Sequence, residues 1–235
     1  MLSPEALQKD FEILRYQLEN VHPGLYTYTS KKEMDKQFDN IKNKLNVAQN
    51  SADFFKNLLP ILKPIGNNHT SIKAPQDYVD FLLNSAYRFP MKVYIRKDSL
   101  YVLSDLSNEK IIGNGKLIKS INGVASQAII QQIINLRSTD GYNRTYPMHV
   151  ASYTFIRYYA YLYGHPEQFE MEYFNRENKL EKTVIKALTV AQIKENEKTI
   201  TIKAKVEKDF QLTINNGIGI LRLSLIHISE PTRPY

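Results

Sequence analysis

The hydrophobic period of this chain changes once, at Phe89, and this change limits the folds that the chain can adopt. Before Phe89, apolar residues recur at intervals of three and four, as on one face of an amphipathic helix. From residue 89 to residue 95 they alternate with other residues, which is the period of a half-buried strand. The pattern therefore predicts an α+β fold, with an N-terminal helical domain over residues 1–88 and a mixed domain over residues 89–190.

Three helices are expected before the change of period. Ser3 followed by Pro4 is an N-cap with a first-turn proline, and that helix should end where Pro23 follows a histidine. Ser30 begins a capping box for the second helix. Ser51 should cap the third, in which Pro60 removes a hydrogen bond and bends the axis.

Hairpins and two helices are expected after the change of period, because alternating runs are separated by turn residues. The predicted strands are 89–95 with 100–106, then 116–121 before an Asn-Gly turn, and 169–173 with 180–185; the predicted helices are 126–136 and about 147–164. Residues 191–209 are rich in Lys and Glu without a strong pattern, and we interpret them as a linker with at most one polar strand. Residues 210–221 are typical of the opening strands of a further domain.

Composition excludes several classes of function. The 235 residues contain no cysteine, which excludes disulfides, thiolate metal sites and a cysteine nucleophile. The net charge of +7 is spread along the chain without a basic stripe, so we expect no nucleic-acid partner. No apolar stretch has the length of a membrane span, and the first residues do not have the pattern of a signal peptide. The histidines show no metal-ligand spacing, and we expect neither a metal nor a cofactor.

Four motifs carry a resemblance to a known family. These are Leu-Ser-Pro at residues 2–4, His-Pro-Gly-Leu-Tyr at 22–26, Gly-Asn-Asn-His-Thr at 66–70 and Lys-Leu-Ile-Lys-Ser-Ile-Asn-Gly-Val at 116–124. The likeness also includes Asp-Gly-Tyr-Asn at residues 140–143. In this order and spacing they resemble the N-terminal half of tail-specific (C-terminal processing) serine peptidases. The resemblance implies a serine-type endopeptidase that acts on polypeptides in the periplasm or outside the cell, with a PDZ-like module at residues 89–190. Asn67 and Asn68 depart from the family, which usually has Gly-Asp-Gly before the His-Thr pair.

The end of the chain departs further from the family. Residues 223–235 resemble the translation of a sequencing adapter, so we expect a non-native tail there, preceded at 191–222 by a linker and the start of a truncated catalytic domain. On this interpretation the family's nucleophilic serine and its base are missing from the chain. We therefore expect no catalytic residue in it and no peptide-bond hydrolysis.

Two sets of residues are candidates for a binding site. His69 lies on a polar loop that in the family faces the catalytic cleft, although a loop histidine can also simply shape its turn. Gly113, Asn114 and Gly115 are the candidate loop for substrate binding, in competition with a plain hairpin connection. Tyrosines between residues 142 and 163 form either a substrate wall or core packing. An alternative function, from a different class, is a non-catalytic peptide-binding or scaffolding protein that uses the PDZ-like module.

Overall fold

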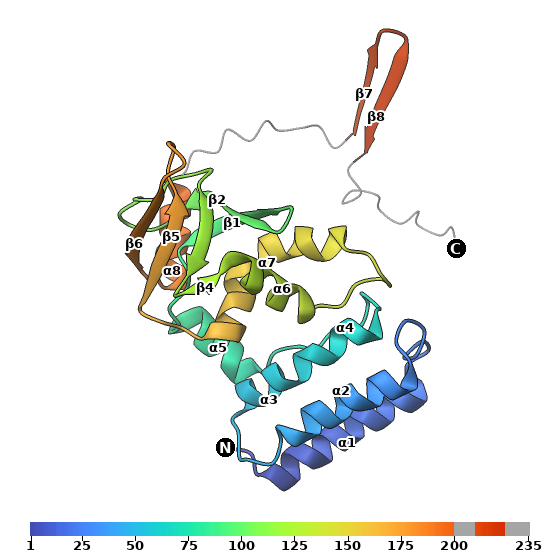
Figure 1. Ribbon diagram of the computed structural model, residues 1–235. Helices are drawn as coiled ribbons and strands as arrows, with labels where there is room; N and C mark the ends of the chain where they lie inside the picture. The colour runs from blue at the N-terminus through green and yellow to red at the C-terminus, as the bar shows by residue number, and fades with distance from the viewer. Residues whose placement is uncertain (200–209, 224–235) are drawn as a thin grey trace, which may run out of the picture. The chain divides into compact units, whose positions relative to one another are not determined.

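The computed structural model describes residues 1–199 and 210–223, which belong to two compact units. The first unit is Met1–Thr199, and it contains both a helical part and a mixed part. The described residues of the second unit form one hairpin of β7 (Phe210–Asn215) and β8 (Ile218–Leu223) (Figure 1). The unit 1–199 carries the candidate sites considered below.

The helical part contains the three expected helices and a further one. The expected cap of the third helix is wrong by one residue, because the Asn50 side chain, not Ser51, accepts from the Asp53 amide. The Ser3 hydroxyl accepts a hydrogen bond from the Ala6 amide, and Ser30 with Glu33 forms a complete capping box, so both predicted N-termini are confirmed. Pro60 lies in a 3-10 turn that interrupts the third helix, as its missing N–H predicts. The elements are α1 (Pro4–Val21), α2 (Lys31–Asn43), α3 (Ser51–Leu58), η1 (Leu59–Ile61), α4 (Leu62–Ile65) and α5 (Gln76–Asn84).

The described residues of the mixed part form a six-stranded antiparallel sheet in the order β1-β2-β3-β5-β6, with the short β4 paired to β3. Two helices, α6 (Ser126–Asn135) and α7 (Thr145–Tyr163), pack against its strands, and α7 lies along the edge strand β1. The strands are β1 (Met91–Arg96), β2 (Ser99–Asp105), β3 (Leu117–Ile121), β4 (Val124–Ala125), β5 (Gln168–Phe174) and β6 (Leu180–Lys186). This mixed helix and sheet content confirms the α+β class.

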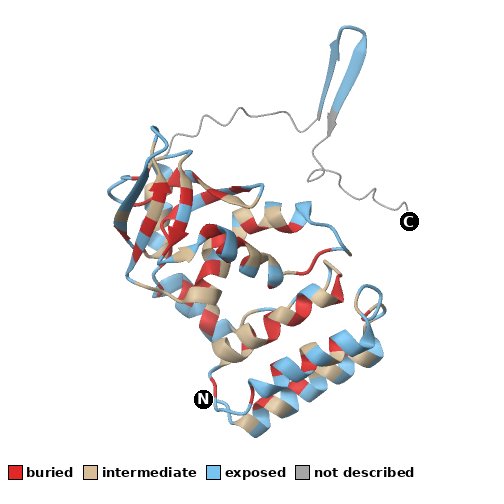
Figure 2. Ribbon diagram, viewed as in Figure 1, coloured by how far each residue is buried: buried red, intermediate tan, exposed pale blue. Residues whose placement is uncertain are grey.

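Two hydrophobic clusters hold the unit together, and Figure 2 marks the buried residues in red along the helices and strands. The helical cluster runs from Leu7 to Ala86 and also includes Leu136, whereas the sheet cluster runs from Phe89 to Ala187. Tyr158 of α7 packs against both clusters, and residues 1–199 form one compact unit. The division of this unit into separate domains at residue 88 stays a prediction.

The interpretation of residues 191–209 as a linker with a polar strand is wrong for its first part. Val190–Lys198 form helix α8, because Thr189 and Gln192 make a capping box in which each side chain bonds the backbone N–H of the other. Residues 200–209 lie outside the described residues, as do residues 224–235 of the expected tail. None of the helices in the described part of the chain is both long and apolar enough to cross a bilayer.

Candidate functional site

Three of the loops that the motifs single out meet in space. The 66–70 loop, which follows α4, bonds to the loop that connects α6 to α7. The Asn68 amide donates to the Asp140 carboxylate over 2.9 Å, and the Gly141 amide donates to the Gly66 carbonyl over 2.9 Å. These bonds join residues more than seventy positions apart, so they fix the relative position of the helical part and the sheet part at this point.

The ring of Tyr28 lies on two glycines of these loops. Gly66 and Gly141 both have left-handed backbone angles, with φ of 65° and 57°. A Cβ atom on Gly66 would lie 2.7 Å from the Tyr28 ring, and one on Gly141 would lie 2.9 Å from it. Glycine is therefore required at both positions for two reasons, the left-handed backbone angle and the close approach of the ring.

A pocket of about 740 Å³, here called the Tyr28 pocket, opens beside this ring. Tyr142 makes an edge-to-face contact with Tyr28, with ring centroids 5.7 Å apart, and is 83% exposed. Lys63, Arg137 and Arg144 also line the pocket. Exposed rings beside cationic side chains suit contact with an extended polypeptide, because the rings offer apolar faces and the cations attract carboxylates.

His22 and Thr70 form the pair that most resembles a base and a hydroxyl nucleophile. His22 Nε2 lies 2.9 Å from Thr70 Oγ1, while His22 Nδ1 accepts a hydrogen bond from the Gly24 amide. Since Nδ1 accepts, the proton of the neutral ring is on Nε2, and this nitrogen donates to the threonine. The ring therefore cannot take the Thr70 proton in this arrangement, and the pair fastens α1 to the 66–70 loop.

His69 is exposed, and its ring makes no hydrogen bond with another described residue. Its amide donates to the Asn67 side chain over 2.8 Å, which is the local turn that an asparagine typically stabilises. His69 does not line the Tyr28 pocket, although Gly66, at the start of the same loop, does. Its role as a residue of a substrate cleft stays a prediction.

The candidate loop at Gly113, Asn114 and Gly115 is bonded within the chain. The Gly113 amide donates to the buried carboxylate of Asp105, and the Gly115 amide donates to the Val102 carbonyl over 2.7 Å. The Asn114 side chain accepts from the Asp105 amide. A substrate carboxylate would have to replace Asp105 at the Gly113 amide, and these internal bonds oppose that exchange. Substrate binding by this loop stays a prediction.

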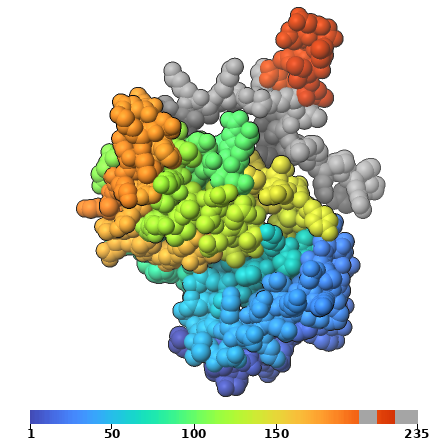
Figure 3. Space-filling model, viewed as in Figure 1, coloured from blue at the N-terminus to red at the C-terminus, as the bar shows by residue number. Residues whose placement is uncertain are grey.

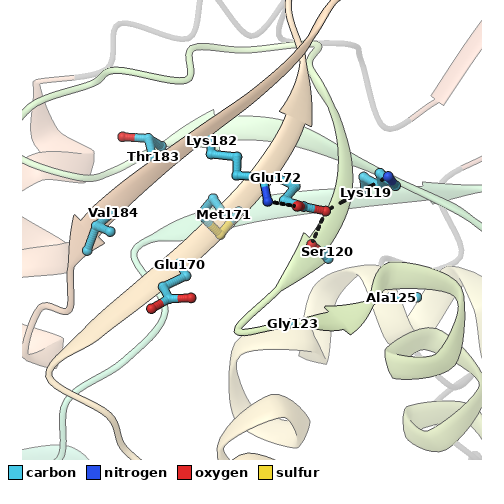
Figure 4. A pocket seen from close by; sticks show the side chains of 10 residues that line it. All are labelled: Lys119, Ser120, Gly123, Ala125, Glu170, Met171, Glu172, Lys182, Thr183 and Val184. Carbon is cyan, nitrogen blue, oxygen red and sulfur yellow. Dashed lines mark hydrogen bonds and ion pairs between the residues drawn. The ribbon is translucent and has the colours of Figure 1, made fainter.

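A serine lies beside a lysine and a glutamate in a pocket of about 580 Å³ on strands β3, β5 and β6 (Figure 4). The Ser120 hydroxyl donates to Glu172 over 2.9 Å, and Lys182 forms an ion pair with the same carboxylate over 2.7 Å. The hydrogen bond from Lys182 lowers the pKa of Glu172, and the same bond raises the pKa of Lys182. Neither group is a base at neutral pH strong enough to activate Ser120, and the cluster is a cross-strand ion pair that sequence reasoning did not single out.

The tyrosines between residues 142 and 163 divide between the two interpretations. Tyr159 is buried in the sheet cluster, and this burial raises its pKa to about 12. Tyr142 and Tyr153 are largely exposed. The inward positions of α7 are therefore core packing, whereas Tyr142 is free to meet a ligand.

No protein-family model and no curated protein sequence matches the chain. Among solved structures, it is similar in fold to CPAF, a chlamydial serine protease. The mature protein has a TM-score of 0.53, a serine-to-alanine mutant 0.55, and the mature protein in complex with lactacystin 0.54, each at 12% identity and covering 78% of this chain. The chain spans about a third of the length of these proteins.

Proposed function

We propose that this chain is the substrate-handling part of a serine-type endopeptidase that acts on polypeptides. The observation that carries the proposal is the meeting of the 66–70 loop and the α6–α7 loop beside Tyr28 and Tyr142, at a pocket with a cationic wall. The likeness in fold to CPAF supports it, as does the resemblance of the motifs to tail-specific serine peptidases. In this proposal the nucleophile is supplied by a part of the protease that this chain lacks, and the enzyme acts in the periplasm or outside the cell.

The proposal places the catalytic pair outside this chain. No serine hydroxyl in residues 1–199 or 210–223 makes a hydrogen bond with a histidine or lysine side chain. Removing a nucleophile or its base from a serine protease lowers turnover by on the order of a million-fold. The chain alone should therefore bind polypeptide without cleaving it.

A binding and labelling experiment tests this proposal. Binding of an unfolded casein to the chain is measured by fluorescence anisotropy, with the variants Tyr142→Ala and Tyr16→Ala. Tyr16 is an exposed tyrosine of α1 that does not line the Tyr28 pocket, which makes it a matched control. We expect Tyr142→Ala to weaken binding about two- to tenfold, since an aromatic contact of this kind is worth about 0.5–1.5 kcal/mol, and Tyr16→Ala to leave it unchanged.

A fluorophosphonate probe and a casein cleavage assay test the missing nucleophile. We expect neither labelling nor cleavage by the purified chain. Labelling that disappears in Ser120→Ala would instead make Ser120 a nucleophile and overturn the proposal. Equal loss of casein binding in the Tyr142 and Tyr16 variants would move the polypeptide site away from the Tyr28 pocket.

The alternative is a non-catalytic peptide-binding or scaffolding protein in which a peptide adds to an edge of the PDZ-like sheet. One observation bears on it: the Ile95 amide of edge strand β1 donates to the Ser152 hydroxyl of α7 over 3.0 Å. Because α7 covers the β1 edge, a peptide strand could add only to the other edge strand, β6, which contains lysines such as Lys182. Lysines on an edge strand oppose unspecific pairing, so the Tyr28 pocket remains the better supported polypeptide site.

A further inference from the structure

A second pocket, here called the Arg88 pocket, has a volume of about 760 Å³ and lies among α3, α5, α7 and α8. It shares no lining residue with the Tyr28 pocket. Helix α8, which the sequence did not predict, supplies one of its walls through Val190 and Ile193. In Figure 1, α8 is drawn behind β5 and β6, α5 lies below the strands, and α3 lies below α5. The volume is within the range of sites for small ligands.

Most of the wall of the Arg88 pocket is apolar or aromatic. Phe55 comes from α3, Leu82 from α5, Ile156 and Tyr161 from α7, and Ile193 from α8. Side chains of this kind exclude water around a ligand and favour an apolar body over a polar one. The wall thus selects for a hydrocarbon part.

Arg88 lines the same pocket and is only 7% exposed. Its Nη2 atom donates to the Leu82 carbonyl at the end of α5 over 2.9 Å. Its Nε and Nη1 atoms are buried and have no hydrogen-bond partner among the described residues. No carboxylate in the described part of the chain forms an ion pair with it. A buried guanidinium without an anion is costly, because its hydration is lost and not replaced.

The other charges of this pocket add to its positive potential. Lys73, Arg157 and Lys194 line it, and the acidic Glu197 is already paired with Lys92. Desolvation lowers the pKa of Arg88, but an arginine remains protonated in proteins. The pocket therefore offers an apolar wall and a cationic end to its occupant.

We propose that the Arg88 pocket binds a small amphipathic carboxylate, with the carboxylate on the Arg88 guanidinium and the hydrocarbon part against Ile156 and Ile193. A planar carboxylate matches the fork of N–H groups that a guanidinium presents. Because Nε and Nη1 lie beneath the pocket surface, the ligand reaches them only when neighbouring side chains move. We therefore expect association well below the diffusion limit. This site goes beyond the proposed polypeptide site and does not depend on it.

Titration calorimetry with dodecanoate tests this proposal on the full chain. We expect dodecanoate to bind at least tenfold more tightly than dodecanol, which has the same hydrocarbon part without the charge. Arg88→Met keeps most of the side-chain length and removes the cation, and it should abolish this preference. Arg176→Met is the matched control, because Arg176 is exposed in the β5–β6 turn and does not line the pocket.

A second variant keeps the test decisive if Arg88→Met fails to fold. Ile193→Asp places a carboxylate on the exposed helix α8, on the pocket side, and should weaken dodecanoate binding at least tenfold by repulsion. Equal affinity for dodecanoate and dodecanol, or full affinity in both variants, overturns the proposal.

A peptide control separates a small ligand from a chain end. A short apolar peptide with a free C-terminal carboxylate is compared with its C-terminal amide. We expect neither to compete with dodecanoate. Competition by the acid form alone, together with weak dodecanoate binding, would assign the pocket to a polypeptide end and refute the small-molecule proposal. Casein binding at the Tyr28 pocket should be the same in Arg88→Met, so the two proposals can fail separately.

Discussion

Replacing Gly66 by alanine places a methyl group against the ring of Tyr28. The new Cβ atom would lie 2.7 Å from Cδ2 of the ring and 3.2 Å from the Tyr28 Cβ atom. The second contact involves the base of the side chain, so a rotation of the ring does not relieve it. The backbone must therefore shift either at Gly66 or in the segment that carries Tyr28.

The size of the effect follows from two contributions. The left-handed φ of 65° costs an alanine roughly 1–2 kcal/mol. Overpacking against the ring adds about 1–3 kcal/mol, so the free energy of unfolding should fall by roughly 2–5 kcal/mol. Gly123→Ala isolates the first contribution, because Gly123 has a φ of 75° and no atom within 4 Å of its Cβ position. Gly141→Ala should fall between the two, since its Cβ atom meets the far end of the ring.

Thermal unfolding of the three variants measures this difference. Gly66→Ala should melt roughly 2–12 °C below Gly123→Ala, since 1 kcal/mol corresponds to about 2–4 °C for a domain of this size. The double variant Tyr28→Ala/Gly66→Ala should lose most of the additional cost, which a double-mutant cycle detects. If Gly66→Ala and Gly123→Ala melt together, the ring does not pack on Gly66 as described.

Three other outcomes are expected. Asp105→Ala should lower the free energy of unfolding by about 2–4 kcal/mol in urea titrations, because the buried amide of Ile112 and the half-buried amide of Gly113 lose their acceptor. A smaller loss in Asp105→Asn would agree with this. Burial lowers the pKa of His165 below 6.5, so the unfolded chain takes up the proton first, and stability should fall as the pH drops below about 6.5. His165→Gln should reduce the dependence of stability on pH below about 6.5. An unchanged dependence would show that His165 is not its cause. Thr189→Ala should fray α8 and lower stability by about 1 kcal/mol, measured by circular dichroism during thermal unfolding. The half-buried Thr183→Ala on β6, which lies outside any helix cap, is its comparison.

Much of the fold follows from local sequence. Ser3 and Ser30 begin helices because their hydroxyls accept from backbone amides of their own first turns, which involves only neighbouring residues. The change of period at Phe89 predicts the start of the sheet, since alternation determines which side chains share a face. Helix α8 has no strong apolar period, so its only local signal in the sequence is the capping box at Thr189.

The sites depend on contacts between distant residues. The motifs indicated that Gly66 and Gly141 matter, but the sequence does not show that both support the ring of Tyr28. Arg88 carried no sequence signal, because an arginine after a helix is ordinarily solvated. Its burial arises only when α5, α7 and α8 pack around it. Local hydrogen bonds and hydrophobic period thus determine the elements from the sequence, whereas desolvation and close approach are properties of packed surfaces and are decided by the tertiary structure.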